Sequence, residues 1–244
     1  MQVYSCQENG LDHHTGYHNY VFIESLTPSA CICLLIDRLS TAEPNGSIKK
    51  KLDLLLQNIV HEKKQHQPND LRTKHPGVIL REILEVIYIE LNIFFHPDST
   101  SSKPFSSFTL AVFDEEMNKG ALLGVGESIL GINGKLMQFT ADSNTIPVIS
   151  TPGTFDTWFE HHQQKIALST IQDISIASNG ILTFQRINQH TAEINPVTFL
   201  LTDQPQENEP DMLSVRLRSL AEKYSLFPAD DIAIVRILFN KVIT

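Results

Sequence analysis

The stretch that decides the fold of this 244-residue chain reads Ser107-Phe108-Thr109-Leu110-Ala111-Val112-Phe113. Two segments follow it closely, Leu123-Gly124-Val125-Gly126-Glu127-Ser128 and Leu136-Met137-Gln138-Phe139-Thr140-Ala141-Asp142-Ser143. Short apolar or alternating runs at 108–113, 121–125, 128–132 and 135–139 are typical of β-strands. A turn at 118–120 separates the first two runs. Asn133-Gly134 separates the last two, and this dipeptide is a strong hairpin signal. We therefore expect an antiparallel meander in the middle of the chain.

The flanking sequence places helices and further strands around this meander. On its N-terminal side, apolar runs at 20–23 and 30–36 predict a hairpin that ends at Asp37, and helical spacing predicts helices at 48–60 and 76–95. On its C-terminal side we expect strands at 171–177 and 181–184, a helix at 212–224 and a last strand at 232–239. This order does not fit a doubly wound parallel sheet, in which strands and helices alternate throughout. It predicts an α+β sandwich forming a single domain over residues 1–244.

Composition limits the partners and the compartment. A net charge of -9, with no basic block longer than Lys49-Lys50-Lys51, argues against nucleic acid as a partner. No apolar run is long enough to cross a bilayer and residues 1–10 lack the order of a signal peptide, so we expect a cytoplasmic protein without a membrane partner. Cys31 and Cys33 lie in an apolar run and are expected to be core thiols. Composition leaves the oligomeric state open.

The ordered series in the middle of the chain resembles the central sheet of the metal-dependent type 2C protein phosphatases. In that family the series reads Gly-Thr-Thr plus an apolar run, Gly-Asp-Ser, and then Leu-Thr-x-Asp-His. The resemblance implies an α-β-β-α sandwich with two mainly antiparallel sheets. It also implies two manganese or magnesium ions at the end of the sandwich, which activate a water that attacks phosphoserine or phosphothreonine. Two such ions need several carboxylates, because the repulsion between the ions must be offset.

The resemblance also indicates where the metal-binding acids should stand, and only some of these positions carry an acid. Asp37 and Asp230 are retained. At the two other acid positions the chain has the amides Asn19 and Asn179. Glu127 replaces the acid of the Gly-Asp-Ser motif and keeps a residual charge. A site with so few acids is expected to bind two dications poorly.

Arg38 follows Asp37 at a position where the family has glycine. Its guanidinium is permanently cationic and can fill by hydrogen bonding the space that a metal would take. We expect it to pair with Asp37 or with Asp230. An alternative is one surviving ion with His18 as a substitute ligand, although magnesium and manganese prefer oxygen donors.

Three functions follow from these observations. The leading hypothesis is a pseudophosphatase without a cofactor, which binds a protein partner by holding a phosphoprotein or by docking a regulatory protein. The first alternative is a weak or divergent manganese- or magnesium-dependent Ser/Thr phosphatase that uses Asp37, Asp230 and Glu127. The second alternative is a structural subunit of an assembly.

Overall fold

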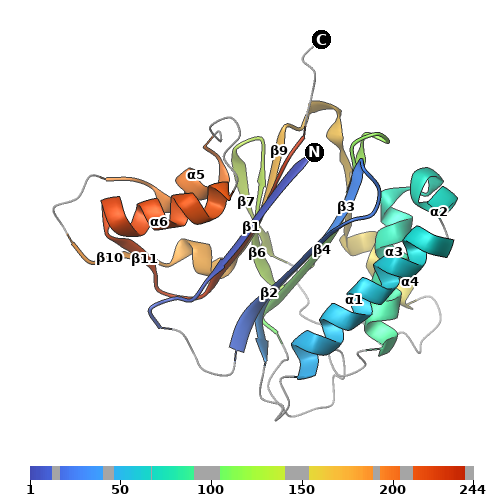
Figure 1. Ribbon diagram of the computed structural model, residues 1–244, viewed down its shortest axis with the longest axis horizontal. Helices are drawn as coiled ribbons and strands as arrows, with labels where there is room; N and C mark the ends of the chain where they lie inside the picture. Colours follow the sequence, from blue (N-terminus) through green and yellow to red (C-terminus); the bar gives the residue numbers. More distant parts are fainter. Residues whose placement is uncertain are drawn as a thin grey trace.

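Two antiparallel sheets lie face to face between two layers of helices, in the order helix, sheet, sheet, helix (Figure 1). The structure is a computed structural model and describes residues 1–12, 17–40, 47–66, 68–90, 105–140, 154–188, 193–203 and 211–239. The predicted α+β sandwich with two mainly antiparallel sheets is thus confirmed.

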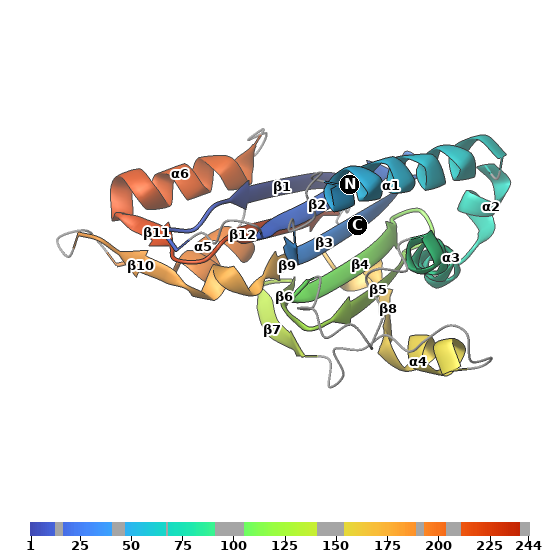
Figure 2. The same ribbon diagram turned by 90° about the horizontal axis from the view of Figure 1, so that it is seen from below.

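The first sheet, here the β3 sheet, has the strand order β2-β3-β4-β5-β8. Its strands are β2 (Tyr17–Ser25), β3 (Ala30–Ser40), β4 (Ser107–Asp114), β5 (Lys119–Val125) and β8 (Gln163–Ala167). Its outer face is covered by α1 (Ser47–His66), α2 (Pro68–Thr73), α3 (Pro76–Glu90) and α4 (Thr154–His162), as Figures 1 and 2 show.

The second sheet, here the β12 sheet, has the strand order β1-β12-β9-β6-β7. Its strands are β1 (Gln2–Glu8), β12 (Ile232–Leu238), β9 (Asp173–Ser178), β6 (Glu127–Ile132) and β7 (Lys135–Thr140). Its outer face is covered by α5 (Pro196–Leu201) and α6 (Met212–Tyr224). Beside these helices, β10 (Phe184–Arg186) and β11 (Leu226–Pro228) form a separate two-stranded sheet.

Strand β3 is buried on both faces, as its unbroken apolar sequence predicts. Cys31, Cys33 and Leu35 point into the core between the sheets, whereas the alternate residues Ile32 and Leu34 point into the core beneath the helices. Both cysteines are free, and burial raises the pKa of Cys31 to about 12. They are core thiols, as expected.

The predicted central meander is divided between the two sheets, which is a correction. Strands β4 and β5 belong to the β3 sheet, and β6 and β7 belong to the β12 sheet. The chain changes sheet at Gly126, which has a φ of +82° and lies so close to Ser106 and Ser107 that a β-carbon would collide with them. A hydrophobic pattern reports which residues are buried but does not report which sheet a strand joins.

Three smaller differences concern the type of one element and the ends of two others. The segment predicted as a strand at 181–184 is a 3-10 helix, Asn179–Leu182, followed by the short strand β10. Strand β3 continues past Asp37 to Ser40, and α3 ends at Glu90, with residues 91–95 of the predicted helix outside the described part of the chain. Among the described helices, none has the length and apolar character needed to cross a membrane.

Candidate functional site

The candidate site begins at an irregularity where strands β2 and β3 pair. His18 lies opposite Leu39 and Tyr20 lies opposite Ile36, so Asn19 faces two residues, Asp37 and Arg38. This is a β-bulge, in which one strand carries an extra residue. Arg38 has a φ of +52°, a left-handed conformation that favours glycine. The backbone therefore takes here a shape suited to the glycine of the family motif, although the residue is arginine.

Asn19 holds the bulge and also connects the two sheets. Its Oδ1 accepts a hydrogen bond from the backbone N–H of Arg38 at 3.0 Å. Its Nδ2 donates to the hydroxyl of Ser178, on the other sheet, at 3.4 Å, and this hydroxyl also accepts from the backbone N–H of Ala233 at 3.0 Å. An aspartate at position 19 would have no Nδ2 donor for Ser178. The amide therefore has a structural use in this chain.

Asp230 and Asp231 lie between β11 and β12, and contacts from two distant segments fix their position. Gly10 donates its backbone N–H to Asp231 Oδ1 at 2.8 Å, and Thr183 Oγ1 accepts from the backbone N–H of Asp230 at 3.1 Å. A β-carbon at Gly10 would collide with the backbone of Asp230, and one at Gly180 would collide with that of Asp231. The two aspartates are therefore packed between the end of β1 and the turn after β9.

The guanidinium of Arg38 reaches across to this loop and forms an ion pair with Asp230 Oδ2. This is one of the two pairings that the sequence predicts for Arg38. Asp37, Arg38 and Asp230 are thus brought together, although Asp37 and Asp230 are far apart in the chain.

Asp37 is 5% exposed, and its carboxyl group is in an environment that disfavours the charged form. Burial is the main reason that the pKa of Asp37 is raised to about 7, and the negative charges of Asp230 and Asp231 raise it further. The positive charge of Arg38 lowers the same pKa, but not enough to restore an ordinary value. Near neutral pH the carboxyl group of Asp37 is therefore only partly ionised.

Asn179 and Glu127 form a second group of polar side chains on the β12 sheet. Asn179 Nδ2 donates to Glu127 Oε2 at 3.2 Å, while Asn179 Oδ1 is buried and has no hydrogen-bond partner among the described residues. Glu127 is exposed, and its charge is not among those that shift the pKa of Asp37. Ser178, which precedes Asn179, connects this pair to Asn19. For His18, only the backbone lies within the described part of the chain.

The sequence did not single out Asp231, Ser178 or Gly10 as parts of this site. Asp231 adjoins a predicted site residue, and Ser178 belongs to the Ser178-Asn179-Gly180 step, so both could have been included. Gly10 carries no signal of its own, since its role depends on a contact with a loop more than 200 residues away.

No protein-family model matches the chain, and neither does any curated protein. Solved structures do match it, over nearly its whole length. The PP2C domain of SiaA from Pseudomonas aeruginosa is 15% identical, with a TM-score of 0.53, and the match covers 98% of this chain and 86% of that one. A serine/threonine phosphatase from S. agalactiae is 11% identical, with a TM-score of 0.56 and coverages of 96% and 98%. The chain has the PP2C-type phosphatase fold.

At these identities the likeness shows the PP2C-type fold and gives no residue of the site its role. A third structure with this fold, RsbX in complex with magnesium, is 11% identical, with a TM-score of 0.50 and coverages of 96% and 93%. The magnesium belongs to RsbX, so the fit of a metal to this chain depends on the side chains described above.

These side chains do not fit a pair of divalent ions. The described ranges contain no group of three or more histidine, cysteine, aspartate or glutamate residues placed to hold a metal. Asp230 is paired with Arg38, and both ends of the Asn19 amide are used in hydrogen bonds within the protein. Asn179 Oδ1 is buried and has no hydrogen-bond partner within the described residues, but a single such oxygen cannot hold two ions.

Proposed function

We propose that this chain is a pseudophosphatase, a PP2C-type fold without metal-dependent hydrolysis that acts by binding a protein partner. The observation that carries this proposal is the ion pair between Arg38 and Asp230, next to the buried Asp37. A fixed cation at this place has an electrostatic role that a metal would otherwise have, because it offsets the charges of the neighbouring aspartates.

Charge decides which of the two expected kinds of partner fits the site better. Phosphoryl chemistry places a dianionic group beside the metal ions, which neutralise it. Without metals, such a group would meet Asp37, Asp230 and Asp231, with Arg38 as the nearby cation. This arrangement repels a phosphate, so our proposal favours a regulatory protein that is recognised without a phosphate group.

A second candidate is a weak or divergent metal-dependent phosphatase. Two observations favour it: Asp37 lies close enough to Asp230 and Asp231 for their charges to act on it, and Asn179 Oδ1 is buried without a partner. An ion held near these oxygens would act as a Lewis acid and lower the pKa of a water bound to it. Arg38 would have to leave Asp230 to make room for the ion.

Manganese titration of the wild-type protein separates the two candidates. For the pseudophosphatase we expect no change in melting temperature at millimolar manganese or magnesium, and no metal-dependent hydrolysis of a small aryl phosphate. Asp37→Ala serves as the matched control for any residual rate. A rate above the blank that depends on metal and is lost in Asp37→Ala would establish the enzyme and overturn the proposal.

A further inference from the structure

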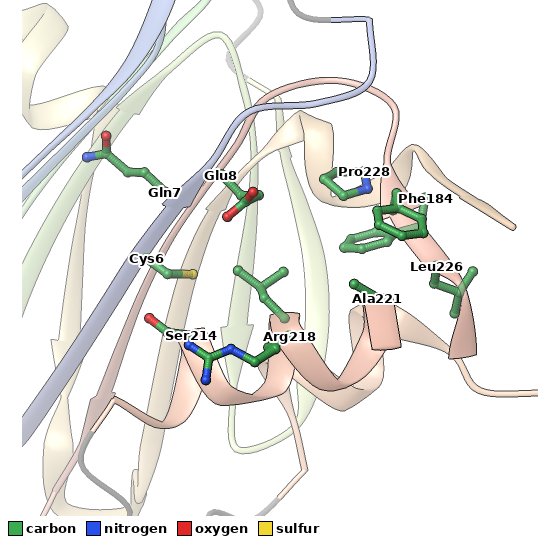
Figure 3. A pocket seen from close by; sticks show the side chains of 11 residues that line it. Cys6, Gln7, Glu8, Phe184, Ser214, Arg218, Ala221, Leu226 and Pro228 are labelled. Carbon is green, nitrogen blue, oxygen red and sulfur yellow. The ribbon is translucent and has the colours of Figure 1, made fainter. Parts of the chain in front are cut away.

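A cavity on the outer face of the β12 sheet, next to α6, is a candidate binding site that is separate from Asp37 and its neighbours. It has a volume of about 360 Å³ and lies between β1, one face of α6 and the β10–β11 pair (Figure 3). This volume is within the range of roughly 300–1,000 Å³ that is usual for ligand pockets. Its apolar lining comes mainly from Phe184, Leu217, Ala221 and Leu226.

The cavity runs along the edge of strand β1. Three consecutive residues of β1, Cys6, Gln7 and Glu8, line the cavity, although the Gln7 side chain is turned away from α6 (Figure 3), which indicates that the main chain of β1 borders it. Strand β1 is an end strand that pairs with β12 on one side, and no other described strand pairs with its second edge. Such an edge can pair with an extended peptide through main-chain hydrogen bonds.

Two opposite charges stand on the two walls of this cavity. Glu8 lies on β1 and Arg218 lies on α6, one turn from Ser214 and close to Leu217 (Figure 3). Neither side chain makes an ion pair or a hydrogen bond with another described residue, and both are exposed. The cavity thus has an apolar lining, an anion without a described partner on one wall and a cation without one on the other, which suits a ligand that carries an apolar group and a charge of each sign.

We propose that this groove binds an extended peptide segment of a partner protein. The segment places one large apolar side chain in the cavity, with a basic residue next to Glu8 and an acidic residue next to Arg218. In an extended segment, alternate residues share a face, so the three recognised side chains are at positions one, three and five. The inference does not rest on the proposed function, because the groove shares no residue with the Asp37 site.

Two short capped peptides test the proposal, because the direction of the added strand is open. One has the sequence Lys-Thr-Phe-Thr-Glu and the other has the reverse charge order, Glu-Thr-Phe-Thr-Lys. We expect one of them to bind about tenfold more tightly than the other, since two exposed charge pairs are attractive in one order and repulsive in the other. Amide NMR shifts of residues 6–8 and 214–221 of the full chain, followed at millimolar peptide, measure both the site and the affinity.

Charge reversal on the protein gives the decisive comparison. The double variant Glu8→Lys with Arg218→Glu is expected to prefer the peptide of the opposite order. Lys223→Glu makes the same change of charge at an exposed position of α6 outside the cavity lining, and is expected to leave the preference unchanged. The Ala221→Trp variant places a large side chain in the cavity and should prevent binding of both peptides. If this variant does not fold, the charge-reversal variant still tests the proposal.

Three results would overturn the proposal. The first is the absence of shifts in either segment at millimolar peptide, and the second is equal affinity for the two charge orders. The third is binding of free phenylalanine as tight as that of the peptides, which would assign the cavity to a small amphoteric ligand.

Discussion

Arg38 combines an unfavourable backbone conformation with a favourable ion pair. Its φ of +52° costs a residue with a β-carbon about 1 kcal/mol relative to glycine. The pair with Asp230 joins side chains that are 45% and 27% exposed, and such pairs contribute only about 0–1 kcal/mol. The arginine therefore adds little net stability at this position.

Two substitutions at position 38 separate these effects. Both Arg38→Gly and Arg38→Ala remove the guanidinium, but only glycine relieves the left-handed backbone. We expect the glycine variant to be more stable than the alanine variant by about 1 kcal/mol, measured by urea unfolding. Equal stabilities would contradict the strained conformation of Arg38.

The raised pKa of Asp37 makes stability depend on pH. The unfolded chain releases this proton near the ordinary pKa of about 4, whereas the folded protein holds it until about 7. The stabilisation from the bound proton is complete below pH 4 and is lost as the pH rises through 7. Asp37→Asn removes this dependence, so its stability relative to wild type should rise by about 3 kcal/mol between pH 5 and pH 8, out of about 4 kcal/mol over the full range.

Urea midpoints of wild type and Asp37→Asn at pH 5, 6.5 and 8 measure this effect. Glu222→Gln, which removes one carboxylate from the exposed face of α6, is the control and should show a constant difference from wild type. A constant difference for Asp37→Asn as well would show that its carboxyl group titrates normally.

At the scale of single elements, the end of α5 depends on a buried arginine. Arg236 of β12 is 0% exposed and forms an ion pair with Asp173 of β9. It also donates to the carbonyl groups of Leu200 at 3.2 Å and Asp203 at 2.8 Å. These carbonyls lie at the C-terminal end of α5, where a helix has no internal donors. Arg236 thus connects α5 to the sheet beneath it.

Removing this arginine leaves Asp173 buried without its partner. We expect Arg236→Met to destabilise the protein by about 3–5 kcal/mol, whereas Arg218→Met on the exposed surface of α6 should change stability by less than about 0.5 kcal/mol. The double variant Asp173→Leu with Arg236→Met should recover part of the loss, because no isolated charge remains. A double variant less stable than Arg236→Met would show that the hydrogen bond from Ser175 Oγ to Asp173 Oδ1, at 3.3 Å, outweighs the cost of the isolated charge.

At the scale of the whole molecule, the fold should tolerate a return of the missing acids. The variant Asn19→Asp, Arg38→Gly, Asn179→Asp adds two carboxylates and removes the cation. We expect it to be less stable than wild type without metal, because the carboxylates repel one another and the bond from Asn19 to Ser178 is lost. Manganese should raise its melting temperature, because binding to the folded state adds about 2.7 kcal/mol to the free energy of unfolding at a free concentration a hundredfold above the dissociation constant.

Asn19→Asp with Asn179→Asp, which keeps Arg38, is the matched control and should respond to manganese less. If the triple variant folds and its melting temperature does not respond to millimolar manganese, Asp37 and Asp230 do not converge on a shared metal site. The PP2C-type fold would stand in either case.

The sequence predicted the sandwich because most of its elements bury one face or both, and the resulting periodicity is local. It did not predict strand β1, whose sequence is mainly polar (Gln2, Ser5, Gln7 and Glu8 among its residues), because this strand lies at the end of its sheet. Nor did it predict the change of sheet at Gly126, which depends on contacts with Ser106 and Ser107.

For the candidate site, the sequence named three residues that the structure brings together, Asp37, Arg38 and Asp230, but not most of their contacts. The pairing of Arg38 with Asp230 was one of two expected arrangements, because a guanidinium beside acids has few other partners. The contact of Gly10 with Asp231 and the bridge from Asn19 to Ser178 depend on the packing of the two sheets. No sequence spacing carries that information.

The packing of Gly10 and Gly180 against the backbone of Asp230 and Asp231 has a consequence for how such a protein can change during evolution. Besides the bonds made by their carboxylates, close main-chain contacts that involve no charge hold this loop in place, so a mutation that alters an acid leaves those contacts intact. Selection on shape and selection on chemistry therefore act on different codons. A lineage with this fold could lose or regain acids one at a time, whereas a single β-carbon at either glycine would displace the whole loop.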